Sequence, residues 1–192
     1  MLRRCFNVCV LIALSLTASF VVSAQEVVHA LSGTVSAINP TAKTIVINTN
    51  DGSFGLFKQL TKSDVQLLFE NDIRSHTTPA DTFQDKGAQV IVYYYGGGFG
   101  DSSDRTAVAL QNLGAEPIEK DTGTVVKCNK HALTIKTGSG AEETFQIGDA
   151  AVAETATGAM RAEKFDPEKG EQVRVIAALD NGQKTLLFVR EM

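Results

Sequence analysis

The sequence is poor in cysteine and in long hydrophobic runs. Two of its three cysteines, Cys5 and Cys9, lie in a segment that we expect to be removed, so only Cys128 stays in the mature chain. A single cysteine excludes a disulfide framework within the chain, and its apolar position in the repeat described below predicts a buried thiol. Beyond residue 24 no apolar run is long enough to span a bilayer, so we expect no stable membrane span after cleavage.

The segment that we expect to be removed is residues 1–24. Two arginines precede an apolar run over residues 8–22, and Val22-Ser23-Ala24 offers short side chains where a signal peptidase cleaves. This order predicts a signal peptide, cleavage before Gln25, and a mature protein that is periplasmic or secreted. The alternative is an uncleaved membrane anchor, which the short and interrupted apolar run disfavours.

Basic residues are also scarce. Removal of the signal leaves 18 − 2 = 16 basic residues against all 22 acidic ones, a formal charge of 16 − 22 = −6. A surface of this sign repels phosphate backbones. The composition therefore argues against a nucleic-acid partner.

No catalytic or metal-ligating cluster is visible. The three histidines are isolated, with no cysteine or second histidine three or four positions away, which disfavours zinc. The sequence also lacks Gly-x-Ser-x-Gly and any serine or cysteine with a placed base. The glycine-rich stretch 96–100 precedes a strand instead of a helix and is an imperfect single match to a calcium repeat, so we interpret it as a hairpin tip. We predict no catalytic residue, no metal and no cofactor.

What the sequence does contain is one β pattern written twice. Each copy opens on Gly-Thr-Val, continues with a strand that alternates apolar and polar residues, and returns to Gly-x-x-Val-x-Val before a last strand. Alternation with period two is typical of half-buried strands, and several short strands with little helix favour closure into a small barrel. The matching segments are Gly33–Ile38, Thr44–Thr49 and Gly87–Val92 in the first copy, and Gly123–Cys128, Ala132–Thr137 and Gly170–Val175 in the second.

The predicted fold class is therefore all-β, with two tandem small five-stranded OB-like β-barrels after the signal peptide. The expected domains are residues 25–113 and residues 123–192, joined by a linker over 114–122. On the third strand of the first copy, we expect Phe54 and Leu56 to face the core.

The two copies differ most between their third and fourth strands. Ser63–Phe69 alternates apolar and polar residues, which favours a strand, although Ser63 could also cap a helix. Ala80–Phe83 and Ala162–Phe165 are expected to form single turns that plug one end of each barrel.

The Gly-Thr-Val opening, the alternating second strand and the later Gly-x-x-Val-x-Val resemble an uncharacterised family of exported bacterial repeat domains of unknown function. The resemblance covers nearly all of residues 31–192 and implies an exported protein with OB-like barrels. The family often has a charged residue after the glycine of strand four; Glu171 matches this pattern and Ala88 departs from it. Because the family has no settled activity, the resemblance implies no catalytic residue.

The one candidate binding surface is the aromatic run Tyr93-Tyr94-Tyr95 together with Phe99. If Tyr94 faces the core, Tyr93 and Tyr95 face outward and form a larger apolar surface than scattered residues give. Tyr93, Tyr95 and Phe99 would then stack on a flat ligand. The alternative is that this face packs against the other barrel, because tandem domains need an interface.

These features predict an exported, non-enzymatic binding or interaction module, with a small molecule, a glycan or a protein as its partner. Two alternatives stay open. One is a structural component of an envelope complex that docks through the tyrosine face. The other is a hydrolase whose site lies between the two barrels and is assembled from residues far apart in the sequence.

Overall fold

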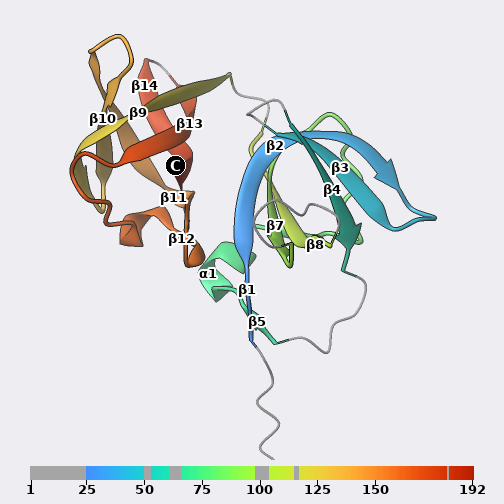
Figure 1. Ribbon diagram of the computed structural model, residues 1–192. Helices are drawn as coiled ribbons and strands as arrows, with labels where there is room; N and C mark the ends of the chain where they lie inside the picture. The colour runs from blue at the N-terminus through green and yellow to red at the C-terminus, as the bar shows by residue number, and fades with distance from the viewer. Residues whose placement is uncertain (1–24, 50–52, 61–65, 98–103, 115–116, 181) are drawn as a thin grey trace, which may run out of the picture.

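The protein folds into two closed five-stranded β-barrels in tandem, as predicted (Figure 1). The structure is a computed structural model, and it describes residues 25–49, 53–60, 66–97, 104–114, 117–180 and 182–192. Among these residues, no helix has the length and apolar character needed to cross a membrane.

The first barrel is a closed sheet in the order β4-β3-β2-β7-β8, with antiparallel neighbours and a short parallel pairing between β4 and β8. A two-residue strand, β6, extends the sheet beyond β8. The strands are β2 (His29–Asn39), β3 (Thr44–Thr49), β4 (Phe54–Gln59), β6 (Thr78–Pro79), β7 (Gln89–Tyr95) and β8 (Thr106–Asn112).

The second barrel repeats this connectivity in the order β10-β9-β13-β14-β11, closed by pairing of β10 with β11. The pair β11–β14 is parallel, as β4–β8 is in the first barrel. Pairing of β9 with β13 begins at Ile118, inside the segment expected to be a linker. The elements are β9 (Ile118–Asn129), β10 (Ala132–Thr137), β11 (Glu142–Thr155), β12 (Gly158–Arg161), the 3₁₀ turn η1 (Ala162–Lys164), β13 (Gln172–Asp180) and β14 (Gln183–Glu191).

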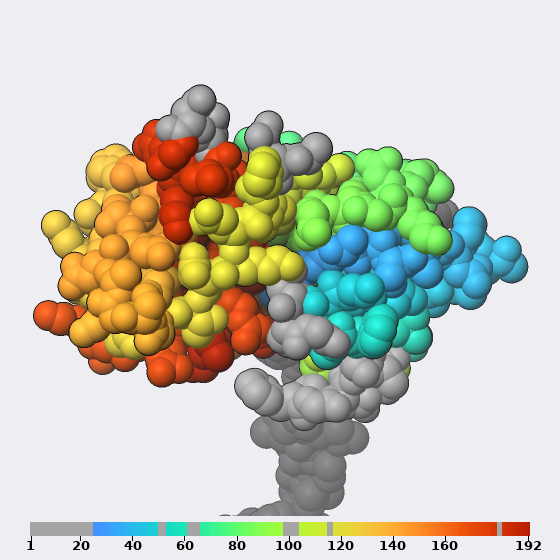
Figure 2. Space-filling view, turned by 90° about the horizontal axis from the view of Figure 1, so that it is seen from above, coloured from blue at the N-terminus to red at the C-terminus, as the bar shows by residue number. Residues whose placement is uncertain are grey.

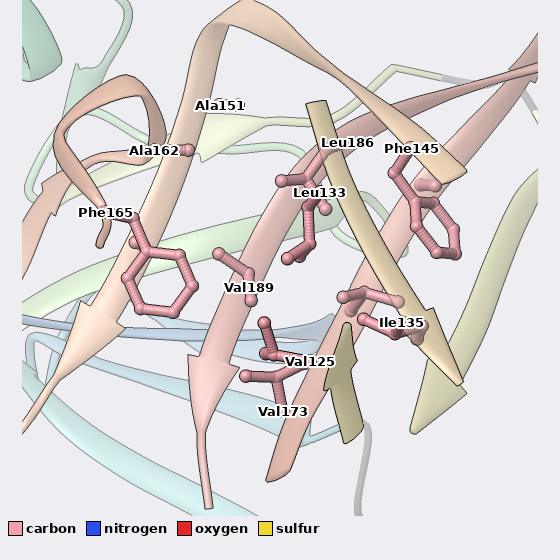
Figure 3. Packing of buried hydrophobic residues seen from close by; sticks show 13 residues of the cluster. Val125, Leu133, Ile135, Phe145, Ala151, Ala162, Phe165, Val173, Leu186 and Val189 are labelled. Carbon is pink, nitrogen blue, oxygen red and sulfur yellow. The ribbon is translucent and has the colours of Figure 1, made fainter. Parts of the chain in front are cut away.

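Each barrel has a hydrophobic core of its own. The first core contains Ile45, Ile47, Val90 and Val92, all inaccessible to solvent. The second is built from the equivalent strands, and its side chains converge inside the sheet (Figure 3). The alternating residues of the two copies are thus buried separately, as the repeat predicts; in the second core they are Leu133, Ile135, Val173 and Val175.

The facing of β4 differs from the prediction. Phe54 and Leu56 point outward and are 71% and 50% exposed, whereas Gly55 and Phe57 point into the first core. Phe57 pairs with Ile45 on β3, just as the core residue Phe145 pairs with Leu133 in the second barrel. A shift of one residue moves every side chain of a strand to the other face, so Phe57, and not Phe54, is the counterpart of Phe145.

The segments between the third and fourth strands plug the barrels. Ala80 and Phe83 belong to the first core, and η1 with Phe165 belongs to the second, which confirms the expected single turns. The half-buried Cys128 packs against the second core, and its thiol donates to the Phe165 carbonyl at 3.5 Å.

The longer segment of the first copy contains a strand and a one-turn helix. Leu67–Leu68 is extended, as favoured by the sequence, and forms β5, which pairs in parallel with β1 (Glu26–Val27). Ser63 lies outside the described residues. The helix α1 (Asn71–Arg74) follows. Its Ile73 is buried in an apolar cluster to which both barrels contribute.

The facing of β4 can be tested by two phenylalanine substitutions. Phe57→Ala should lower the free energy of unfolding by about 3–5 kcal/mol, because it leaves a cavity in the first core. Phe54→Ala should change it by less than about 0.5 kcal/mol, because the ring is exposed. Urea denaturation of both variants measures the two values. Equal losses, or a larger loss for Phe54→Ala, would contradict the register described above.

Candidate functional site

A third hydrophobic cluster joins the two barrels, which lie side by side in Figure 2. It forms because the outward faces of β2, β7 and β8 in the first barrel carry apolar residues, as do those of β11, β13 and β14 in the second. These faces exclude water from each other, which stabilises the contact in proportion to the apolar area buried. The buried members are Val28, Ala30, Phe69, Ile73, Ile91, Tyr93, Ala109, Val152, Ile176 and Phe188.

Tyr93 lies at the centre of this interface. Its side chain is fully buried, with its ring centroid 5.0 Å from that of Phe69. The hydroxyl donates to Gln111 Oε1 at 2.6 Å, and Gln111 Nε2 donates to the Ala150 carbonyl at 3.0 Å. Burial raises the pKa of Tyr93, so the phenol stays neutral and keeps its proton for this bond. The hydrogen bonds therefore connect β7 and β8 to β11 across the interface.

The aromatic run is divided among three environments. Tyr93 packs between the barrels. Packing of this kind was the alternative to an exposed ligand-binding platform. Tyr94 packs against the first core, with its ring 5.3 Å from that of Phe57. Tyr95 is half-buried at the end of β7, and Phe99 lies outside the described residues. A ligand role for Tyr95 and Phe99 stays a prediction.

A pocket of about 390 Å³ opens where the interface becomes polar. Its volume falls in the range of small-molecule sites. Both barrels supply its walls: His29, Tyr94, Gly97 and Arg105 come from the first, and Glu154, Thr155, Ala156, Arg190, Glu191 and Met192 from the second.

Glu154 is the most enclosed charged group of the pocket. Its side chain is 9% exposed. One carboxylate oxygen lies 2.7 Å from His29 Nδ1, and the other accepts the Ala30 backbone N–H at 2.7 Å. Burial raises the pKa of Glu154, and the hydrogen bonds from Ala30 and His29 partly oppose this effect. A carboxyl on β11 is thus fixed to β2 of the other barrel by both of its oxygens.

Two arginines complete the polar wall. The guanidinium of Arg105 lies over the Tyr94 ring, 5.3 Å from its centroid. Arg190 on β14 stands opposite Glu154 on β11 in the sheet register. Burial raises the pKa of the Tyr94 hydroxyl, while Arg105 and Arg190 lower it and Glu154 raises it. The pocket therefore brings together two carboxyls, an imidazole, a phenol and two guanidiniums.

These pocket residues were not predicted from the sequence. His29 and Glu154 are 125 positions apart, so no local motif could relate them. A partial signal was present, since Glu154 interrupts an apolar stretch at the position after Ala153, where alternation points it away from the second core. No set of three or more His, Cys, Asp or Glu side chains in the described part of the chain is arranged to hold a metal ion.

A second exposed feature lies on the outer face of β3 and β4. Phe54 and Leu56 project there, and Leu56 stands opposite Val46. The equivalent pair in the second barrel is polar, with the hydroxyls of Thr134 and Thr144 2.9 Å apart. The two barrels therefore differ in the chemistry of this face although they share its backbone.

In comparisons with known proteins, no family model and no curated relative matches the chain. The resemblance to exported repeat domains therefore stays a prediction from the sequence.

The burial of Glu154 predicts a pH dependence of stability. Because its pKa is raised on folding, the folded protein holds this proton more tightly than the unfolded chain does. The stabilisation is present below the ordinary glutamate pKa of about 4.3 and is lost as the pH rises through the raised value. In Glu154→Gln the side chain cannot titrate, so the difference in unfolding free energy, Glu154→Gln minus wild type, should grow over that window.

Urea titrations at several pH values measure this difference. Glu142→Gln, at an exposed position of β11, serves as the matched control and should follow the wild-type profile. Identical pH profiles for wild type and Glu154→Gln would contradict the raised pKa.

Proposed function

We propose that the protein is an exported binding module that holds a small ligand in the pocket between its barrels. The observation that carries this proposal is a cavity of about 390 Å³ into which both barrels direct polar side chains. Concave sites with a few convergent polar groups and shifted pKa values are the usual places of ligand binding. The expectation of export comes from residues 1–24 and from the resemblance described above.

The hydrogen bonding in the pocket supports binding more than catalysis. Both oxygens of Glu154 already have partners, as does His29 Nδ1. The Thr155 hydroxyl lies 2.9 Å from that of Thr157 and donates to the Gly158 carbonyl. Side chains fixed in this way orient a ligand, whereas a nucleophile needs a hydroxyl or thiol beside a free base. No such pair lines the described part of the pocket.

A thermal-shift screen of the chain from residue 25 onward tests the proposal. The probes are simple sugars, short peptides, carboxylic acids, phosphate esters and divalent cations. At least one class should raise the melting temperature with saturation, since a ligand that binds only the folded state stabilises it. Ala156→Trp, in the turn that lines the pocket, should abolish the shift.

Ala141→Trp is the matched control, because Ala141 is exposed in the β10–β11 turn and does not line the pocket. It should leave the shift intact. The proposal fails if no class shifts the melting temperature, or if Ala156→Trp responds like the wild type.

A hydrolase is a second candidate. The favouring observation is a carboxyl of raised pKa beside an imidazole in a cleft, a combination used in general acid–base catalysis. Turnover of a bound ester, amide or glycoside by the wild type, lost in His29→Gln with binding retained, would favour it over simple binding. Unchanged substrate after prolonged incubation would dismiss it.

A structural component of an envelope complex is a third candidate. Phe54 and Leu56 favour it, since two neighbouring apolar side chains are exposed on the outer face of the first barrel. Cross-linking from position 56 should then capture one defined partner, and loss of that partner in Phe54→Ser would support the contact. Cross-linking that does not depend on Phe54 would argue against it.

A further inference from the structure

The sheet register places two arginines directly opposite each other beside the pocket. Arg174 on β13 pairs with Arg190 on β14. Their neighbours Val175 and Val189 point into the second core, so the arginines, at alternating positions, point outward toward the interface side. Arg190 in turn stands opposite Glu154 on β11. A row of one carboxylate and two guanidiniums thus crosses three strands at the mouth of the pocket.

Like charges that face each other across two strands destabilise a sheet. A carboxylate between them would remove the repulsion, but neither Arg174 nor Arg190 forms an ion pair with any described residue. Glu154 is the acidic group opposite Arg190 in the register, and both of its oxygens are engaged by His29 and Ala30. Glu154 therefore attracts Arg190 across the strands without forming an ion pair with it, and among the described residues Arg174 has no acidic partner at all.

The first barrel adds a third guanidinium from the other wall. Arg105 lies against the Tyr94 ring, 5.3 Å from its centroid, and this contact orients its planar group. Arg105 also forms no ion pair among the residues that the structure describes, and its Nε is buried without a hydrogen-bond acceptor. Arginines from two domains therefore face one cavity with unused donors.

We infer that the ligand of the inter-barrel pocket is a small organic anion, whose carboxylate or phosphate group is held between Arg190 and Arg105. This inference rests on the proposed function of the pocket. A guanidinium presents a planar fork of donors that matches carboxylate and phosphate oxygens, and such charge-assisted bonds are among the strongest in proteins. The bound anion would also relieve the repulsion between Arg174 and Arg190.

The remaining charges of the pocket limit the number of negative charges that the ligand can carry. Glu191 lines the same cavity, and the chain from residue 25 onward carries a formal charge of 16 − 22 = −6. A polyanion such as a nucleic acid or a long polyphosphate would be repelled by this surface. The site therefore suits a ligand with one or two anionic groups and an otherwise neutral body.

Isothermal titration of the chain from residue 25 onward, at low ionic strength, tests the inference. The probes are succinate, glycerol 3-phosphate and, as the neutral counterpart, glycerol. We expect saturable binding of at least one anion and none of glycerol. Arg190→Gln and Arg105→Gln should each weaken that binding by about 10-fold or more, the effect of one lost charge-assisted hydrogen bond. The anion that binds tells a carboxylate site from a phosphate site.

Arg74→Gln is the matched control. Arg74 also lies over an aromatic ring, 5.2 Å from the centroid of Phe69, but it does not line the pocket. Arg74→Gln removes the same charge as Arg190→Gln but outside the pocket. The affinity of this variant for the anion should therefore equal that of the wild type. A melt without ligand gives an independent readout: Arg174→Gln should melt at or above the wild-type temperature, because the repulsion from Arg190 is gone while the attraction between Arg190 and Glu154 stays.

The outcomes separate the ligand class from the proposed function. If Arg74→Gln weakens anion binding as much as Arg190→Gln does, the net charge of the protein explains the effect, and the inference is overturned. If a neutral or cationic probe binds, Ala156→Trp blocks it and no anion binds, the ligand class is wrong and the binding function stands. If no probe binds in the pocket, both are overturned.

Discussion

The apolar contact between the two barrels is the interaction on which the rest of the structure depends. Each barrel closes its own core, yet each also exposes a second apolar face on the outside of its sheet, and those two faces meet around Tyr93, Ile176 and Phe188. Buried apolar area supplies the favourable free energy, and the bond from Tyr93 through Gln111 to β11 satisfies the polar atoms that this burial encloses. Without the contact, neither the pocket nor the pairing of His29 with Glu154 would exist.

The chemistry of the pocket follows from where that apolar contact ends. Glu154 lies just beyond Val152 on the same face of β11, so it is largely buried and needs partners from the opposite barrel. Ala30 and His29 supply them, and neither arginine of β13 and β14 forms an ion pair with a described carboxylate. The proposed anion is therefore a consequence of the interface: the oxygens of Glu154 that could bond Arg190 are already used to join the barrels.

The sequence predicted the barrels because their signal is local and repeated. Alternation in Thr44–Thr49 and its copy identifies strands, and the shared order of strands identifies two units. The facing of β4 was predicted wrongly because Phe54, Leu56 and Phe57 fit either register, and only the pairing of Phe57 with Ile45 decides between them. The pocket could not be predicted at all, since His29 and Glu154 meet through the packing of two domains and carry no local motif.

Because they share this interface, we expect the two barrels to unfold as one cooperative unit. Residue-resolved urea unfolding, followed by NMR on backbone amides of both barrels, tests it most directly. We expect one common midpoint for the wild type and two separate midpoints for Ile176→Asn, which places an unsatisfied amide in the apolar contact while both cores stay intact. Separate midpoints for the two barrels of the wild type would show that the interface does not couple them.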